Sequence, residues 1–267
     1  MVNYKEFNDR LVNIINEGVA KDMIIVDGVV GVGKSSLMEI LAEELNLTVF
    51  PEPVMDNPLL PKFYEDMKKY GFPLQVFFLN NRFRMIKEAQ RLNGAIMDRA
   101  IYGDVIFAKM LGEQGNMSKE ELDCYLDLFA NMMEHLPTPE LLIYLKTDVD
   151  SAIRKIQKRG RDFEQDTPRQ YWEDLNREYD DYFSSCTVAP ILTIDVSDLD
   201  YVNNIEDREY VVGLIKDKLK EMSEDDQLKL LATDGMLVKR PLVIGDDFVL
   251  TGFREKEWSE AMHVWCA

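Results

Sequence analysis

The 267-residue chain has little of three features that mark large classes of protein: cysteine, positive charge and long apolar runs. Its three cysteines, Cys124, Cys186 and Cys266, lie far apart in no metal-binding or redox spacing, which indicates a reducing, cytoplasmic compartment. With 31 basic and 49 acidic residues the net charge is −18, which argues against nucleic acid or an anionic membrane as a partner. No apolar run approaches the roughly 18 residues of a membrane span, and the opening MVNYKEFNDR lacks the pattern of a signal peptide.

The composition is that of a globular chain, with 46% hydrophobic and 30% charged residues, and the length suits one α/β domain with an appendage. Short apolar runs typical of buried strands recur at 23–27, 47–50, 95–98, 141–146 and 191–196. Helical segments separate these runs, so we expect a parallel sheet with helices on both faces. Residues 5–20 predict a short amphipathic lead-in helix, with apolar side chains at Phe7, Leu11, Ile14, Ile15 and Val19.

The stretch GVVGVGKSSL (28–37) matches the pattern G-x-x-x-x-G-K-[ST] directly after the first strand-like run. In such a loop backbone N–H groups surround phosphate oxygens, the lysine (Lys34) reaches the β and γ phosphates, and the serine (Ser35) ligates Mg²⁺. The helical run at 35–45 adds the partial positive charge of its N-terminus. The sequence therefore predicts a nucleoside triphosphate site made of Gly28, Val29, Val30, Gly31, Val32, Gly33, Lys34, Ser35 and Ser36.

Charged side chains also follow the next two strand-like runs. FPEPV (50–54) places Glu52 at the end of the second run, on the sheet edge where ligands bind in open α/β sheets. AIMDRA (95–100) ends the third run with Asp98 and Arg99, and a strand-terminal Asp beside such a loop usually binds Mg²⁺ directly or through water. Taken alone, Glu52 would more often be an exposed acidic loop residue.

Two further stretches carry polar groups, one after a helix and one within a helix. KRGRDFE (158–164) follows a helix and, with Lys155, Arg159 and Arg161, looks like a lid that closes over phosphates, although a lone charge run is more often a solvated face. FPLQVFFLNNRFR (72–84) places Gln75 and Arg82 two turns apart along one helix face. A polar pair on an otherwise apolar helix predicts a pocket wall.

These elements, in this order, resemble the deoxynucleoside kinase family, and most closely its bacterial deoxyadenosine/deoxyguanosine kinase branch, over about residues 20–220. The resemblance rests on GVVGVGKSS, PEPV, FYEDMKKYGFPLQVFFLNNRFR, DRAIYGD and KRGRDFEQ. It implies an α/β P-loop kinase fold with strand order 2-3-1-4-5, in which ATP with Mg²⁺ phosphorylates the 5′-hydroxyl of a deoxyribonucleoside. It also suggests a homodimer and feedback inhibition by the end-product deoxynucleoside triphosphate.

Carried over position by position, the resemblance implies that Glu52 accepts the proton of the 5′-hydroxyl and that Arg99 binds near that hydroxyl and the arriving phosphate. The resemblance also implies that Tyr64 and Glu164 hold the 3′-hydroxyl, and that Gln75 pairs with the base, with Arg82 and Asp104 beside it. It implies phosphate binding by Lys34, Lys155, Arg159 and Arg161, and metal binding by Ser35 and Asp98. An Arg82–Asp104 pair can serve adenine or guanine by exchanging partners, which predicts a purine deoxynucleoside over thymidine. Ala100 departs from the family, which usually has serine there, and so lacks a hydroxyl near the base pocket.

The C-terminal part resembles a second family. LLATDGMLVKRPLVIGDDFVLTGFREKEW looks like the last third of the arsenate reductase/Spx-like thioredoxin-fold proteins, in which an Arg-Pro pair, here Arg240-Pro241, lies beside a catalytic cysteine. That cysteine and the first half of the domain are absent, so we do not expect a redox domain. A hairpin at 236–253, turning at Gly245, Asp246 and Asp247, and a helical segment after it are expected. We therefore divide the chain into a kinase domain (1–220), an acidic linker (221–227) and a partial thioredoxin-like segment (228–267).

Two other functions share part of this pattern. A nucleoside monophosphate kinase of the thymidylate kinase type has the same loop and an Asp-Arg pair, but it needs an additional basic site, where PEPVMDNP (51–58) offers acid. A non-catalytic nucleotide-sensing adaptor would need no general base, whereas Lys34, Glu52, Asp98 and Arg99 are all retained.

Overall fold

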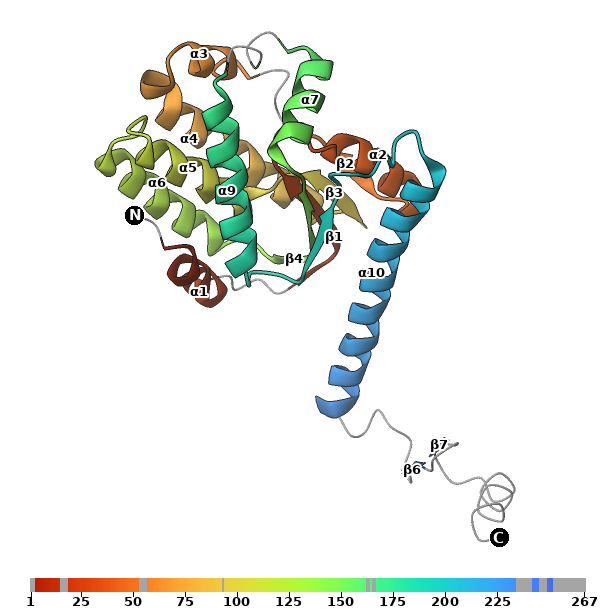
Figure 1. Cartoon of the computed structure of the whole chain (residues 1–267). Helices are drawn as coiled ribbons and strands as arrows, with labels where there is room; N and C mark the ends of the chain where they lie inside the picture. Colours follow the sequence, from red (N-terminus) through yellow and green to blue (C-terminus); the bar gives the residue numbers. More distant parts are fainter. Residues whose placement is uncertain are drawn as a thin grey trace. The chain divides into compact units, whose positions relative to one another are not determined.

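The computed structural model describes residues 3–14, 19–52, 57–92, 94–161, 164, 167–233, 242–244 and 249–251, and the chain divides into two compact units, 1–213 and 214–267 (Figure 1). The helices and strands of the described residues are, in chain order, α1 (Tyr4–Ile14), β1 (Val19–Gly28), α2 (Lys34–Leu45), β2 (Thr48–Phe50), α3 (Leu60–Glu65), α4 (Met67–Ala89), β3 (Ala95–Asp98), η1 (Ile101–Gly103), α5 (Asp104–Glu113), α6 (Lys119–Met133), β4 (Thr138–Lys146), α7 (Val149–Arg159), α9 (Arg169–Ser185), β5 (Ile191–Asp195), α10 (Ile205–Thr233), β6 (Leu242–Ile244) and β7 (Val249–Thr251).

The first unit is built on a five-stranded sheet in the order β2-β3-β1-β4-β5. All four neighbouring pairs are parallel, which confirms the strand order implied by the family resemblance. The central strand β1 is buried on both sides, with Ile24, Ile25 and Val26 at most 2% exposed. A continuous apolar strand of this kind is typical of parallel sheets covered on both faces.

Helices cover the sheet as the alternation of runs predicted. Helices α4, α5, α6 and α9 pack on one another in one layer, and α1 packs against α6 and α9 (Figure 1). Helix α2 packs against β1, β2 and β3, and Figure 1 shows it across the sheet from that layer. The loop between β1 and α2, the end of β2 and the end of β3 therefore meet at the carboxyl edge of the sheet, where a ligand site is expected.

The lead-in helix is shorter than its periodicity predicts. Helix α1 ends at Ile14, and Val19 is already the first residue of β1. Val19 is in register with Thr138 of β4, so strand pairing decides the conformation of this β-branched residue. The prediction of a helix through Val19 was wrong, and residue 15 lies outside the described residues.

The C-terminal region contains the expected hairpin pairing. Strands β6 and β7 pair antiparallel, Leu242 with Thr251 and Ile244 with Val249, which confirms the hairpin. Its turn (Gly245, Asp246 and Asp247), the Arg240-Pro241 pair and the helical segment after residue 253 lie outside the described residues. The acidic stretch 221–227 is helical and lies within α10, while its use as a domain boundary stays a prediction. None of the described helices is long and apolar enough to cross a membrane.

Candidate active site

The loop from Gly28 to Gly33 has the backbone geometry of a phosphate cradle. Gly31 and Gly33 have φ values of 82° and 115°, a region that L side chains rarely adopt. A Cβ on Gly31 would lie 2.9 Å from the carbonyl oxygen of Ala152, and one on Gly33 would lie 2.1 Å from the hydroxyl of Tyr201. Glycine is thus required both for the turn and for the close packing of α7 behind it.

Lys34, the first residue of α2, has its ammonium group inside this loop. Its Nζ donates hydrogen bonds of 3.0 Å to the carbonyl oxygens of Gly28 and Val29. The side chain is 7% exposed. Burial and the nearby charge of Arg99 lower the pKa of Lys34 to about 8, although the negative charges of Asp98 and Glu52 oppose this shift.

Ser35 and Asp98 form the pair predicted to serve the metal. The Ser35 hydroxyl donates to Asp98 Oδ2 at 2.9 Å, while Asp98 Oδ1 is buried without a hydrogen-bond partner. A free buried carboxylate oxygen beside a hydroxyl suits Mg²⁺, which binds through one or two protein oxygens together with substrate phosphates and water. No group of three or more His, Cys, Asp or Glu side chains able to hold a metal exists within the described parts of the chain.

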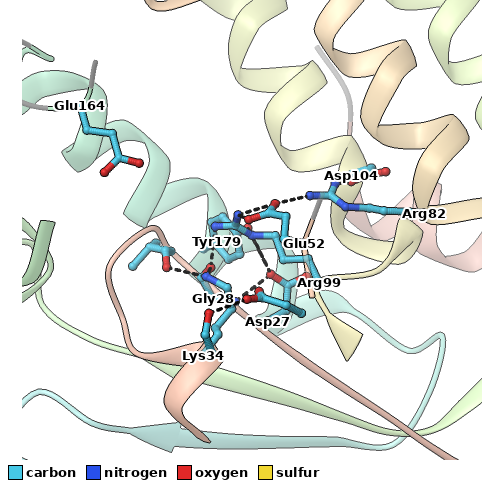
Figure 2. Close-up of polar contacts among 12 residues, drawn as sticks. Asp27, Gly28, Lys34, Glu52, Arg82, Arg99, Asp104, Glu164 and Tyr179 are labelled. Carbon is cyan, nitrogen blue, oxygen red and sulfur yellow. Dashed lines mark hydrogen bonds and ion pairs between the residues drawn. The ribbon is translucent and has the colours of Figure 1, made fainter. Parts of the chain in front are cut away.

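Glu52 lies between two arginines next to this loop (Figure 2). Arg99 Nη1 donates to both carboxylate oxygens at 2.8 and 2.9 Å, and Arg82 Nη2 donates to Oε1 at 2.6 Å. On its other side Arg82 pairs with the fully buried Asp104. The four side chains therefore form one continuous network of alternating charge, drawn from the loop after β2, α4, the end of β3 and α5.

The network keeps Glu52 ionised. Burial acts to raise the pKa of Glu52, but the positive charges of Arg99, Arg82 and Lys34 outweigh it, and the pKa falls to about 2. A carboxylate with two cations beside it can orient a hydroxyl group. It becomes a better proton acceptor when the cations turn towards a transferring phosphoryl group, because their charge then stabilises the carboxylate less.

Arg99 has an unusual backbone, with φ at 56°. Its N–H donates to the carbonyl of Val26 at 3.0 Å, and its guanidinium reaches the Gly28 carbonyl at 3.1 Å and the Tyr179 hydroxyl at 3.0 Å. A left-handed conformation at a non-glycine residue costs free energy, and such residues concentrate at functional sites. This backbone turns the side chain from the sheet edge towards Glu52 (Figure 2).

The predicted lid residues lie around Glu164. Arg159, the last residue of α7, donates to Glu164 Oε2 at 2.5 Å, and Arg161 Nη1 lies 3.4 Å from Oε1. Glu164 is 4% exposed, so the two arginines balance a buried charge. Lys155 donates to the carbonyl of Val32 at 3.2 Å, on the outside of the phosphate loop.

A cavity of about 400 Å³ joins these groups. From the predicted site its walls include Val30, Gly31, Gly33, Lys34, Ser35, Ser36, Glu52, Tyr64, Gln75, Arg82, Asp98, Arg99, Arg159, Arg161 and Glu164. Phe78 and Phe107 also line it, under the guanidinium groups of Arg82 and Arg99 at 4.8 and 5.4 Å from the ring centres. Gly28, Val29, Val32, Asp104 and Lys155 lie behind the wall rather than in it. Ala100 is 1% exposed and is not among the residues that line the cavity.

Sequence reasoning missed Asp27 and Tyr179. Asp27 is the last residue before the glycine loop and accepts from the Gly28 N–H at 2.7 Å and from the Tyr179 hydroxyl at 3.2 Å. Its position next to the motif was a usable signal, because a strand-terminal carboxylate faces the ligand edge. Tyr179 is one of several aromatic residues in α9, and nothing in its spacing distinguishes it.

A glycine-rich phosphate loop, a carboxylate and hydroxyl suited to Mg²⁺, and a buried carboxylate between arginines on one sheet edge define a P-loop phosphotransferase. The chain belongs to the deoxynucleoside kinase family, whose model matches residues 24–220. It is an enzyme of the phosphotransferase class that this family represents.

Individual relatives agree over nearly their whole length. A deoxyguanosine kinase from Lactobacillus johnsonii is 42% identical over 215 residues, which cover 76% of this chain and 96% of that protein. A deoxyadenosine/deoxycytidine kinase from Bacillus subtilis is 37% identical over 211 residues, covering 78% and 95%. The structure of deoxyadenosine kinase from M. mycoides with bound dATP superposes with a TM-score of 0.66 at 30% identity, covering 73% of this chain and 98% of that one.

The C-terminal region has a separate match. The ArsC family model matches residues 205–261, which overlaps the end of the kinase match and extends beyond it. This agrees with the resemblance to arsenate reductase-like proteins seen in the sequence.

Proposed function

We propose that this protein transfers the γ-phosphoryl group of ATP to the 5′-hydroxyl of a purine deoxyribonucleoside, deoxyadenosine or deoxyguanosine, and so serves nucleotide salvage. The observation that carries the proposal is the Glu52 carboxylate, held by Arg99 and Arg82 in the wall of the same cavity as the phosphate loop. The names of the relatives, deoxyguanosine kinase and deoxyadenosine/deoxycytidine kinase, support it.

In this proposal the acceptor hydroxyl takes the place beside Glu52 that the cavity leaves open. Glu52 orients the hydroxyl and accepts its proton as the new P–O bond forms, which suits the loose transition state of phosphoryl transfer. Arg99 stabilises the charge on the moving phosphoryl oxygens, and Lys34 exchanges its loop carbonyls for the β and γ phosphates. Ser35 and Asp98 would hold Mg²⁺, which would supply positive charge to the phosphate oxygens.

The remaining polar groups have roles in binding. Gln75 reads the base edge, and the Arg82–Asp104 pair lies beside it with Phe78 as a stacking surface. Tyr64 and Glu164 bind the 3′-hydroxyl of the sugar. Arg159 and Arg161 bind phosphates from α7 and the segment after it, which requires them to share or exchange their contact with Glu164. Lys155 binds phosphates only if it leaves the Val32 carbonyl, because it does not line the cavity.

Regulation and assembly belong to the same proposal. The M. mycoides deoxyadenosine kinase has structures with bound dATP and with bound dCTP, which supports feedback inhibition by a deoxynucleoside triphosphate at this site. We also include a homodimeric assembly and a cytoplasmic location, the latter in keeping with the scarcity of cysteine.

Incubation of the purified protein with ATP, Mg²⁺ and each of the four deoxynucleosides tests the proposal. We expect the highest kcat/KM for deoxyadenosine or deoxyguanosine. A preference for thymidine contradicts the purine assignment, and phosphorylation of deoxynucleoside monophosphates alone would favour a thymidylate-type kinase. No transfer at all, with ATP still bound, would favour the non-catalytic adaptor.

The Asp104→Ala variant sharpens the purine assignment. It leaves Arg82 with Glu52 as its remaining ion-pair partner and removes the acceptor from the Nη1 side of the buried guanidinium, and an unsatisfied buried polar group costs about 1–3 kcal/mol. We expect kcat/KM for the purine deoxynucleosides to fall about tenfold or more, while the exposed Asp123→Ala variant on α6 leaves it unchanged. Equal loss for all four deoxynucleosides would show that Asp104 supports Glu52 rather than the base.

A further inference from the structure

Each nitrogen of the Arg99 guanidinium has a hydrogen-bond partner. One of these partners, Tyr179, has none of the roles described above. Nη1 donates to Glu52, Nη2 donates to the Gly28 carbonyl, and Nε donates to the hydroxyl of Tyr179 at 3.0 Å (Figure 2). Tyr179 comes from the middle of α9 and is not part of the cavity wall. It therefore contacts Arg99 from the protein side, away from the substrates.

The Tyr179 hydroxyl is itself held by a buried carboxylate. It donates to Asp27 Oδ1 at 3.2 Å, and the same oxygen accepts from the Gly28 N–H at 2.7 Å. Asp27 Oδ1 also lies 3.5 Å from Arg99 Nε. One tyrosine hydroxyl thus accepts from Arg99 and donates to Asp27, which uses both of its hydrogen-bonding capacities.

The ring of Tyr179 has little freedom to move. It is fully buried, it lies edge-on to Phe107 at 6.1 Å between ring centres, and it stacks with Tyr144 and Phe183 at 6.3 and 6.1 Å. Its neighbour in the helix, Glu178, is paired with Lys109 of α5 and accepts from the Tyr4 hydroxyl of α1. Helix α9 is therefore anchored at the point from which Tyr179 reaches the active site.

We propose that Tyr179, backed by Asp27, is a positioning residue that holds the Arg99 guanidinium against Glu52 in the orientation needed for phosphoryl transfer. Arg99 needs such support, because its left-handed backbone is strained and its side chain must keep one orientation while substrates exchange. A hydrogen bond to a charged group in a buried site contributes to this pre-organisation. The inference rests on the proposed function of the cavity.

The Tyr179→Phe variant removes only the hydroxyl. We expect kcat per folded enzyme to fall about ten- to hundredfold, as for loss of a hydrogen bond to a charged group, with KM for ATP nearly unchanged. Tyr182→Phe is the matched control: it lies three residues further along α9, and its hydroxyl donates to the Tyr102 carbonyl instead. That variant should lower Tm without lowering kcat.

A double-mutant cycle separates positioning from a general loss of structure. Arg99→Lys already lacks the Nε–H, so adding Tyr179→Phe to it should lower kcat by less than about twofold. The same full loss in both backgrounds would show that Tyr179 acts independently of Arg99 and would overturn the proposal. A kcat of Tyr179→Phe within about twofold of wild type would also overturn it.

Asp27→Asn keeps the test decisive if Tyr179→Phe does not fold. The amide preserves the size and one acceptor oxygen, but that oxygen is a weaker acceptor than the carboxylate oxygen that faces the Gly28 N–H, the Tyr179 hydroxyl and Arg99 Nε. We expect a smaller loss of kcat in the same direction, which again disappears in the Arg99→Lys background, and an unchanged kcat would contradict the proposal. Wild-type enzyme that phosphorylates no deoxynucleoside would instead refute the proposed function, so the two failures are distinguishable.

Discussion

The two halves of the cavity hold their functional groups by different means. The phosphate half comes from one continuous stretch, 28–36, in which the ammonium of Lys34 lies among the backbone carbonyls of the loop. The acceptor half brings Glu52, Arg82 and Arg99 together from three separate elements and holds them by buried ion pairs. The geometry of the phosphate half is specified by its local sequence. The geometry of the acceptor half depends on ion pairs between residues that are distant in the sequence.

This difference determines how each half responds to substitution. Removing a group from the phosphate loop loses a ligand contact and leaves the remaining backbone groups in place. Removing one member of the buried network leaves an uncompensated charge for its neighbours, which costs about 3–5 kcal/mol when nothing replaces it. The predictions below test this contrast.

The largest effect is expected in the acceptor half. Glu52→Gln keeps the shape of the side chain but removes the proposed general base, so kcat should fall roughly 10²–10⁴-fold while ATP binding is nearly unchanged. Steady-state kinetics and an ATP-binding titration measure the two quantities separately. The exposed Glu65→Gln variant at the end of α3 is the control. A kcat within about threefold of wild type would remove Glu52 from this role.

In the phosphate half the loss should appear in binding and in transfer together. Lys34→Ala removes a cation that faces the phosphates in both the ground state and the transition state, so kcat/KM for ATP should fall about 10²–10³-fold, with KM raised and kcat lowered. Lys119→Ala, an exposed lysine on α6, is the matched control. An unchanged KM would show that Lys34 acts only in the transition state.

The pH profile separates the halves without any substitution. Burial lowers the pKa of Lys34 to about 8, so the free enzyme loses this positive charge as the pH rises above that value. Because the charged form binds the triphosphate, kcat/KM for ATP should fall up to about tenfold per pH unit above pH 8, while kcat persists to higher pH in the bound state. The pKa of Glu52 near 2 produces no matching loss between about pH 5 and 8. A loss of kcat/KM on the acid side of neutrality would contradict this assignment.

The same contrast explains what could be predicted from the sequence. The strands, their order and the phosphate loop follow from local patterns and the family resemblance, because MIIVD and GVVGVGKSS fix their own conformation. Glu52, Asp98 and Arg99 were predicted because each lies at the end of a strand or within two residues of it, at the ligand edge.

Residues that act through tertiary packing could not be predicted in this way. Tyr179 reaches Arg99 from a helix 80 positions further along the chain, and its hydroxyl matters only because α9 lies against the sheet edge. Val19 likewise has helical periodicity but pairs with Thr138 in the sheet. Both depend on contacts between distant segments, which periodicity does not encode.

The smallest effect on catalysis is expected from the C-terminal region. The cavity is lined by residues between Val30 and Tyr171, so deleting 225–267 should leave kcat/KM within about threefold of the full-length value. The hairpin strands β6 and β7 have three residues each, and an isolated two-stranded hairpin is only marginally stable in water. A lower Tm or lost solubility of the shortened protein would show that this region packs on a protein surface, and an unchanged Tm would show that it does not.

We expect no thiol-dependent arsenate reduction by the intact protein, because none of its cysteines stands where the arsenate reductase-like family carries its catalytic one. Such activity would overturn the interpretation of the C-terminal region as a non-redox segment.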